Sequence, residues 1–168
     1  LVTLEEELSN VNNYLTLAQA RFEDDIHVTM LLPEDLSTCY LPPLLLQPLV
    51  ENAVRHGRTS IDERYVRLEI RQEEERLYVC VSDRGHGFPE QVLRDLNDPD
   101  NQTFSGLFNV RKRLRAVYGT QCQFQIVSTP SGSSVSFSIP VRPPVDPERS
   151  EGPCELQCST MKSTPATS

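Results

Sequence analysis

The stretch "LLLQPLVENAVRHG", residues 44–57, combines apolar residues at helical spacing with a group of polar side chains near its end. The spacing predicts an amphipathic helix whose Leu and Val face lies in a core. Glu51, Asn52, Arg55 and His56 place a carboxylate, an amide, a guanidinium and an imidazole within two turns of one another. Core packing alone does not require such a group, so the helix is a candidate for the floor of a binding site.

The composition limits the classes of protein to which the chain can belong. It has 168 residues, 38% of them hydrophobic, and a net charge of −8. The acidic balance argues against a nucleic-acid partner, because phosphate binding needs a basic surface. No apolar run reaches the roughly 18 residues of a membrane span. The start, "LVTLEEELSN", has neither a signal-peptide pattern nor an initiator Met, so we expect a fragment of a longer protein.

The cysteines favour a reducing, cytoplasmic setting. Their number is odd, and their spacing fits neither a disulfide framework nor a paired zinc site. Two of them lie in the tail without further metal ligands nearby. The five are Cys39, Cys80, Cys122, Cys154 and Cys158.

Residues 3–22 are predicted to form a helix. Thr3 and Glu6 have the spacing of a capping box. Apolar residues recur at alternating spacings of four and three, which gives a narrow seam typical of a coiled coil or bundle. The seam either packs on this domain or pairs with a helix outside the fragment, and we favour the second. Its residues are Leu4, Leu8, Val11, Leu15, Ala18 and Phe22.

The remaining pattern predicts an α+β fold, a two-layer α/β sandwich. Strands are expected at 25–33, 65–72, 76–83, 121–128 and 133–141, and helices at 44–57, 89–96 and 106–119, with a loop at 33–43. Because each alternating strand has one apolar face, we expect a mixed, mostly antiparallel sheet with helices on one side. From residue 143 the chain is rich in Pro, Ser and Thr and is predicted to be disordered.

Two further motifs accompany the 44–57 helix. In "SDRGHGF", residues 82–88, Asp83 ends a strand, and Gly85 and Gly87 allow a close backbone approach to a ligand. In "SGLFNVRKRL", residues 105–114, a Gly precedes a helix whose free N–H groups attract an anion such as phosphate. Each motif alone is more often a turn or a helix start than a site.

In this order, the three motifs resemble the N, G1 and G2 boxes of the GHKL ATPase superfamily. The wording is most similar to LytS-like sensor histidine kinases, in "LPPLLLQPLVENAVRHG", "GLFNVRKRLRAVYG" and "VTLEEELSNVNNYLTLAQARFED". The resemblance covers residues 2 to about 141 and implies the GHKL (Bergerat) ATP-binding fold. It implies the second helix of a dimerisation and phosphoacceptor hairpin at 1–23 and the catalytic domain at 24–142, which leaves the predicted disordered tail at 143–168.

The resemblance also implies roles for the polar face of the first motif. Asn52 is expected to coordinate Mg²⁺ that bridges the ATP phosphates, which suits an ion that prefers hard oxygen ligands. Glu51 is the expected catalytic carboxylate, Arg55 is expected to reach the phosphates, and His56 is expected to line the nucleotide.

For the other two motifs, the resemblance implies contacts to the base and to phosphate. Asp83 is expected to accept the adenine exocyclic amine, a contact that guanine does not offer, while Gly85 and Gly87 let the loop approach the base. Phosphate is expected at the helix start formed by Ser105, Gly106 and Leu107. Residues 89–104 then correspond to a mobile ATP lid.

The chain departs from the superfamily pattern at three places. Pro48 replaces a carboxylate or amide four residues before Asn52, and Phe104 replaces a Gly two residues before Gly106. None of the three histidines, His27, His56 and His86, occupies the place of a phosphoacceptor.

The resemblance implies a histidine kinase domain that transfers the γ-phosphoryl group of ATP to a histidine on an upstream helix. The expected partners are ATP and a response regulator, with a homodimer formed through the N-terminal helix. We expect a cytoplasmic domain of a membrane-anchored protein. The alternatives are a non-catalytic nucleotide-binding or dimerisation module and, less favoured, an ATP-driven clamp like the topoisomerase and chaperone members.

Overall fold

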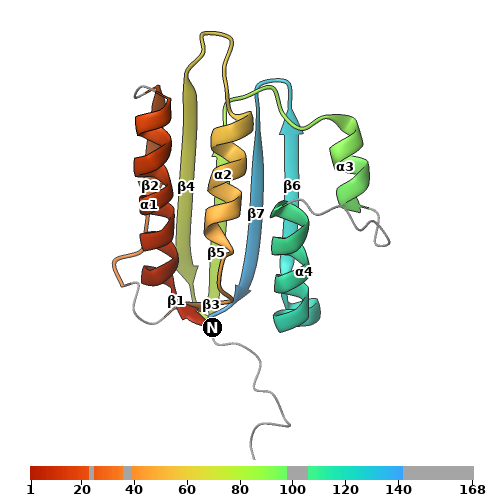
Figure 1. Ribbon diagram of the computed structural model, residues 1–168. Helices are drawn as coiled ribbons and strands as arrows, with labels where there is room; N and C mark the ends of the chain where they lie inside the picture. Colours follow the sequence, from red (N-terminus) through yellow and green to blue (C-terminus); the bar gives the residue numbers. More distant parts are fainter. Residues whose placement is uncertain (23–24, 36–38, 98–105, 142–168) are drawn as a thin grey trace, which may run out of the picture.

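A five-stranded sheet in the order β2-β4-β5-β7-β6 forms one layer of the molecule (Figure 1). The computed structural model describes residues 1–22, 25–35, 39–97 and 106–141. The strands of this sheet are β2 (Ile26–Leu31), β4 (Arg64–Glu73), β5 (Arg76–Asp83), β6 (Gln123–Thr129) and β7 (Gly132–Pro140). The β2–β4 pair is parallel and the other three pairs are antiparallel, so the prediction of a mixed, mostly antiparallel sheet is confirmed.

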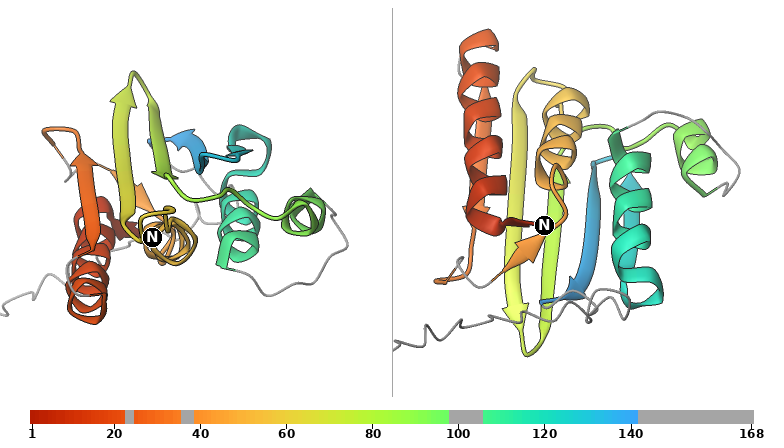
Figure 2. Two further views of the ribbon diagram at one scale, coloured as in Figure 1. Left: turned by 90° about the horizontal axis from the view of Figure 1, so that it is seen from above. Right: turned by 60° about the horizontal axis from the view of Figure 1, so that its bottom comes forward.

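The helices lie on one face of this sheet, as the strand pattern predicts. They are α1 (Leu4–Arg21), α2 (Leu46–His56), α3 (Glu90–Asn97) and α4 (Gly106–Tyr118), followed by a 3-10 turn, η1 (Gly119–Gln121). Figure 2 shows α1, α2 and α4 side by side over the sheet, with α3 beyond α4. The fold is therefore the two-layer α/β sandwich.

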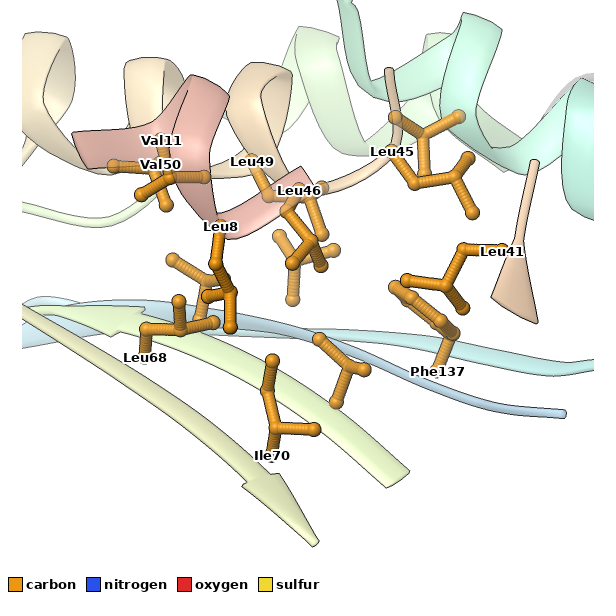
Figure 3. Packing of buried hydrophobic residues seen from close by; sticks show 14 of the residues in the cluster. Leu8, Val11, Leu41, Leu45, Leu46, Leu49, Val50, Leu68, Ile70 and Phe137 are labelled. Carbon is orange, nitrogen blue, oxygen red and sulfur yellow. The ribbon is translucent and has the colours of Figure 1, made fainter. Parts of the chain in front are cut away.

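Alternation along the strands explains the core. Val66, Leu68 and Ile70 on β4 are at most 2% exposed, and β5 presents its own buried residues to the same side. The register places Leu68 opposite Val81 and Ile70 opposite Val79. Figure 3 shows side chains of α1 and α2 descending onto these strands, which closes the apolar layer.

The helix α1 carries the predicted capping box. The Thr3 backbone N–H donates to Glu6 Oε2 at 2.9 Å, and the Glu6 N–H donates to Thr3 Oγ1 at 3.2 Å. The seam of α1, however, packs on this domain, so our expectation that it pairs with a helix outside the fragment is wrong. Its residues Leu4, Leu8, Val11, Leu15 and Ala18 are at most 5% exposed, because the sheet beside α2 offers an apolar face that α1 covers.

A second departure lies between β2 and α2. The expected loop contains a short strand, β3 (Tyr40–Leu41), which pairs antiparallel with β1 (Val2–Thr3). The helix α2 begins at Leu46, after Leu44 takes a left-handed backbone conformation at φ 58°. This small sheet holds the start of α1 against the turn that leads into α2.

No helix among the described residues is long and apolar enough to cross a membrane.

Candidate functional site

A pocket of about 310 Å³ lies between α2, the segment that enters α3, and the head of α4. It gathers residues that are distant in sequence, including six of the predicted site residues. The lining residues are Pro48, Glu51, Asn52, Arg55, His56, Phe88, Pro89, Val92, Gly106 and Leu107.

The helix α2 supplies the polar floor of this pocket. Its opposite face is buried, with Leu49, Val50 and Val54 at most 1% exposed. Glu51 and Asn52 are half-buried. The side-chain amide of Gln47, one helical turn before Glu51, donates to Glu51 Oε1 at 2.7 Å. This hydrogen bond orients the Glu51 carboxylate. The predicted amphipathic arrangement of the 44–57 stretch is therefore confirmed.

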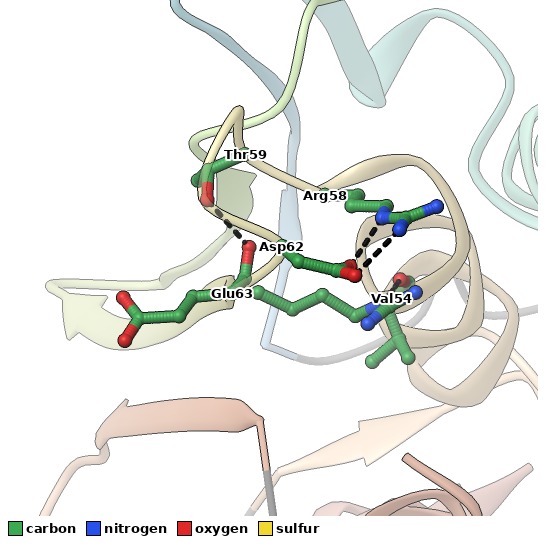
Figure 4. A network of polar contacts seen from close by, with 6 residues as sticks. Val54, Arg58, Thr59, Asp62 and Glu63 are labelled. Atoms are coloured by element: carbon green, nitrogen blue, oxygen red, sulfur yellow. Dashed lines mark hydrogen bonds and ion pairs between the residues drawn. The ribbon is translucent and has the colours of Figure 1, made fainter.

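The C-terminal end of α2 and the turn that follows it are held by several side-chain contacts. At its C-terminal end, Arg64 Nε donates to the carbonyl oxygen of Val54 at 3.1 Å. In the turn that follows, Arg58 forms two hydrogen bonds with Asp62, which lower the pKa of that carboxyl. Figure 4 shows these contacts with the hydrogen bond from Thr59 Oγ1 to the Glu63 carbonyl, at 2.9 Å. They fix the position of the helix end that carries His56.

Asp83 stands at the end of β5 with both carboxylate oxygens engaged. Oδ1 accepts the Gly85 N–H at 2.8 Å, and Oδ2 accepts the Ser133 hydroxyl at 2.5 Å. Asp83 does not line the 310 Å³ pocket. Ser133 is 8% exposed and its contact with Asp83 was not foreseen, because the sequence does not reveal that β7 pairs with β5.

The loop after Asp83 lies directly against the end of α2. A Cβ added at Gly85 would lie 2.1 Å from the His56 carbonyl oxygen and 2.9 Å from Gly57 Cα. Gly87 has φ +75°, and a Cβ there would lie 2.4 Å from the Thr129 carbonyl oxygen. The 44–57 and 83–87 segments therefore meet at Gly85, which is needed for this close approach, while Gly87 allows the loop to approach Thr129.

The wall opposite α2 comes from residues that the motifs did not identify. The Phe88 N–H donates to Ser128 Oγ at 2.7 Å, which ties the entrance of α3 to β6. Phe88, Pro89 and Val92 line the pocket from this side. Their only sequence signal was their place at the start of the expected lid. The later part of that lid, residues 98–104, lies outside the described residues.

The head of α4 closes the pocket. Gly106 begins the helix and Leu107 is 3% exposed, so Leu107 also belongs to the core. Of the cationic residues that follow, Arg113 donates to the carbonyl oxygens of Pro43 at 2.8 Å and Leu44 at 3.3 Å. Burial and the neighbouring Arg115 lower the pKa of Arg111. The predicted site residue Ser105, like Phe104, lies outside the described residues.

The other two histidines lie outside the pocket. His27 is on β2, where its ring stacks on Tyr65 and its side chain is 51% exposed. His86 is exposed within the glycine loop. In the described part of the chain, no group of three or more His, Cys, Asp or Glu residues is placed to hold a metal ion.

The two-layer sandwich, with a polar helix face and a helix head around one pocket, has the fold of histidine kinase catalytic domains. The catalytic domain of the histidine kinase ThkA superimposes with a TM-score of 0.66 at 18% identity, over 84% of this chain and 96% of that one. A histidine kinase domain from Erythrobacter litoralis gives a TM-score of 0.58 at 19% identity, over 79% and 60%. At these identities the likeness concerns the fold.

Sequence comparison assigns the family. Residues 43–143 match the family of histidine kinase-, DNA gyrase B-, and HSP90-like ATPases, and the chain belongs to this family of ATP-binding domains. The sensor protein LytS of Bacillus subtilis is 34% identical over 148 residues, which cover 84% of this chain and 25% of LytS. LytS of Oceanobacillus iheyensis is 33% identical over 149 residues, 84% of this chain and 26% of that protein. The chain thus spans about a quarter of the length of these relatives, and the predicted LytS-like character is confirmed.

Proposed function

We propose that this domain binds Mg²⁺–ATP and transfers its γ-phosphoryl group to a histidine on an upstream helix outside this chain, as part of a LytS-like sensor histidine kinase. The observation that carries the proposal is the junction of two motifs, with Gly85 seated against the His56 carbonyl. A nucleotide placed there has its base beside Asp83 and its phosphates over the polar face of α2.

Asp83 is suited to recognise adenine. The hydrogen bonds from Gly85 and Ser133 fix the carboxylate, and each oxygen keeps a further lone pair. A fixed acceptor favours the exocyclic amine of adenine over the carbonyl that guanine presents at the same place. Gly85 and Gly87 let the loop that follows Asp83 pack closely on His56 and Thr129, and this packing holds the carboxylate in place for the base.

The donor set on α2 fits Mg²⁺. Asn52 offers an amide oxygen, a hard ligand of the kind that Mg²⁺ prefers, and Glu51 lies next to it on the pocket floor, where its carboxylate can hold a metal-bound water. A site with few protein ligands suits an ion that is also held by substrate phosphates and water. When bound, Mg²⁺ neutralises charge on the phosphates.

The remaining groups surround the phosphates. Arg55 is exposed at the pocket edge, where its guanidinium can pair with phosphate oxygens, and His56 lies beside it. The free N–H groups at the head of α4, from Gly106 and Leu107, favour an anion. We include Ser105 in this group from its place in the sequence. Glu51 is positioned to take a proton from the attacking imidazole or to hold a water.

A non-catalytic nucleotide-binding module is the second candidate, and Pro48 is the observation that favours it. Pro48 lines the pocket four residues before Asn52, where superfamily members carry a polar group. A proline side chain cannot accept a proton or bind a metal, so Glu51 is the only carboxylate on this helix that can act as a base.

The full-length protein provides the test. We supply it, with its upstream histidine helix, with labelled ATP and Mg²⁺, and compare it with Asn52→Ala. Label on the protein that is lost in Asn52→Ala supports the kinase. Nucleotide binding without label supports the module, and no uptake of Mg²⁺–ATP at millimolar concentration contradicts both.

For the whole protein we propose a homodimer through the face of the N-terminal helix opposite the buried seam, which is exposed in this chain, a response regulator as phosphoryl acceptor, and a membrane anchor outside this chain. In this scheme residues 1–23 form the second helix of the phosphoacceptor hairpin and 24–142 the catalytic domain. The Pro-, Ser- and Thr-rich tail at 143–168 lies outside the described residues. Transfer of label from the kinase to a response regulator tests the partner.

A further inference from the structure

Glu7 is the only carboxylate or cationic side chain that is buried in the described part of the chain. It lies on α1, between the seam residues Leu4 and Leu8, and is 1% exposed. Removing a carboxylate from water is unfavourable unless hydrogen bonds replace its hydration. An apolar residue at this place would extend the seam at no such cost, so the carboxylate has a specific use.

Three backbone N–H groups satisfy the Glu7 carboxylate, and all three belong to the entry of α2. Leu44 N donates to Oε1 at 2.6 Å. Leu45 N and Leu46 N donate to Oε2 at 2.8 Å and 2.9 Å. These distances are those of charge-assisted hydrogen bonds.

The entry of α2 has no local means of satisfying these groups. Its N-cap residue is Leu45, which forms no side-chain capping hydrogen bond. The first N–H groups of a helix lack partners within the helix, and the same end carries a partial positive charge. Glu7 therefore acts as a cap from a distant part of the chain.

The turn before α2 depends on outside support. Leu44 has φ 58°, a left-handed conformation that is unfavourable for a residue with a Cβ. It is held from two sides, because Glu7 accepts its N–H while Arg113 of α4 donates to its carbonyl oxygen. The turn is thus fixed between α1 and the helix whose head closes the pocket.

We propose that Glu7 is a positioning residue for the nucleotide site, a role that rests on the proposed function. It fixes the start of α2 along its axis and so sets the height of Glu51 and Asn52 in the pocket. Asn52 lies six residues after Leu46, roughly 9 Å along the axis at about 1.5 Å per residue. A helix transmits an axial shift over this length, so a displacement of α1 moves the pocket floor.

The test uses the 168-residue chain and the variant Glu7→Gln. Glutamine has nearly the same shape but only one acceptor oxygen, so its NH₂ group faces at least one of the three N–H donors. Glu5→Gln is the charge-matched control, since Glu5 is exposed in the same turn of α1. Ile26→Ala controls for lost stability, because it opens a cavity under the edge strand β2, whose sheet partner is β4.

Two properties of each variant are measured under conditions in which the variant is folded. In the nucleotide-free protein, we expect the backbone amide resonances of Asn52 and Ala53 to shift in Glu7→Gln and to stay in place in both controls. In calorimetry with Mg²⁺–ATP, we expect binding to Glu7→Gln to be at least about tenfold weaker, with near wild-type binding in both controls. If Glu7→Gln does not fold, Glu7→Asp, which keeps the charge with a shorter reach, is expected to show smaller changes in the same direction.

The two proposals fail in different ways. If the wild-type chain takes up no Mg²⁺–ATP, the proposed function is wrong, and the amide resonances alone decide the positioning role. If Glu7→Gln lowers the melting temperature but leaves the α2 resonances and the affinity unchanged, Glu7 is only structural. The same conclusion follows if Ile26→Ala reproduces the loss of binding.

Discussion

Asp83 is the residue on which the choice of base depends. In Asp83→Asn, one carboxylate oxygen becomes an NH₂ group that presents hydrogen-bond donors to the adenine amine. We expect the Kd for ATP to rise by about 10- to 100-fold, the range for losing a hydrogen bond to a charged group, and the preference for ATP over GTP to disappear.

Asp62→Asn is the control for the Asp83 substitution. It makes the same change at an exposed residue that pairs with Arg58. Calorimetry with both nucleotides measures the preference. If the ratio of ATP to GTP affinity is unchanged in Asp83→Asn, Asp83 does not contact the adenine amine.

Tyr118 predicts how stability changes at alkaline pH. Its side chain is 2% exposed, and its hydroxyl has no hydrogen-bond partner among the described residues. Burial raises its pKa to about 12 in the folded chain, from an ordinary value of 10. Above pH 10 the unfolded chain therefore loses this proton first, and stability falls between pH 10 and 12 by about 2–3 kcal/mol.

Tyr118→Phe tests this assignment. The variant removes this unpaired buried hydroxyl, so we expect equal or slightly higher stability at pH 7 and a shallower fall between pH 10 and 12. Tyr40→Phe, at a residue that is 45% exposed, is expected to keep the wild-type slope. Denaturant unfolding across this pH range gives the comparison. Identical slopes for wild type and Tyr118→Phe would mean that the hydroxyl is not buried as described.

At the scale of elements, periodicity predicts most of the fold. The alternation in β4 and β5 and the seam of α1 were sufficient to place these elements and their buried faces. The β1–β3 pair was missed because two-residue strands have no period. The start of α2 was misplaced because it depends on Glu7, which lies 37–39 residues away from its partners. The partner of the α1 seam was misassigned because a seam indicates a contact without identifying the other surface.

The loop between β5 and α3 can be tested through its glycines. A Cβ at Gly85 would lie 2.1 Å from the backbone of α2, whereas one at Gly119 meets nothing within 4 Å. Gly119 has φ +54°, so Gly119→Ala is expected to cost about 1 kcal/mol of conformational strain. Gly85→Ala must separate the loop from α2, and we expect a loss of at least about 2 kcal/mol together with weaker nucleotide binding.

Thermal unfolding and ATP titration compare the two glycine variants. The control, Gly119→Ala, is expected to bind nucleotide normally. Equal stability losses with normal binding in both variants would show that the close approach of the two motifs is not required.

At the scale of the whole molecule, short motifs predict several residues that line the pocket, but they do not predict which elements meet to form its walls. Glu51, Asn52, Arg55 and His56, which line the pocket, belong to a motif that is local in sequence, whereas Asp83 of the second motif lies outside the lining. Ser133, Phe88 and Val92 could not be found in this way, because they depend on the β5–β7 pairing and on the path into α3. Short segments of sequence therefore identify the polar residues of the pocket, whereas the residues of its other walls depend on how the strands and helices are arranged.

The boundary of the folding unit is also a property of the whole molecule. The resemblance divides the chain after residue 23, yet five seam residues of α1 lie in the same core as the sheet. Deleting residues 1–24 exposes the apolar surface that the seam covers, at a cost of about 1.5–3 kcal/mol for each large side chain, and it removes Glu7 from the head of α2. The combined loss matches the roughly 5–15 kcal/mol of a typical domain. We therefore expect a chain that starts at residue 25 to lack a cooperative thermal transition and to bind no ATP.

The control is a chain that ends at residue 142. It lacks a segment of similar length that the sequence predicts to be disordered, and it should keep the wild-type melting temperature. Circular dichroism of both truncations decides between the two cases. A cooperative transition near the wild-type temperature in the chain without residues 1–24 would make α1 an appendage, whereas the loss of that transition makes α1 part of the catalytic domain.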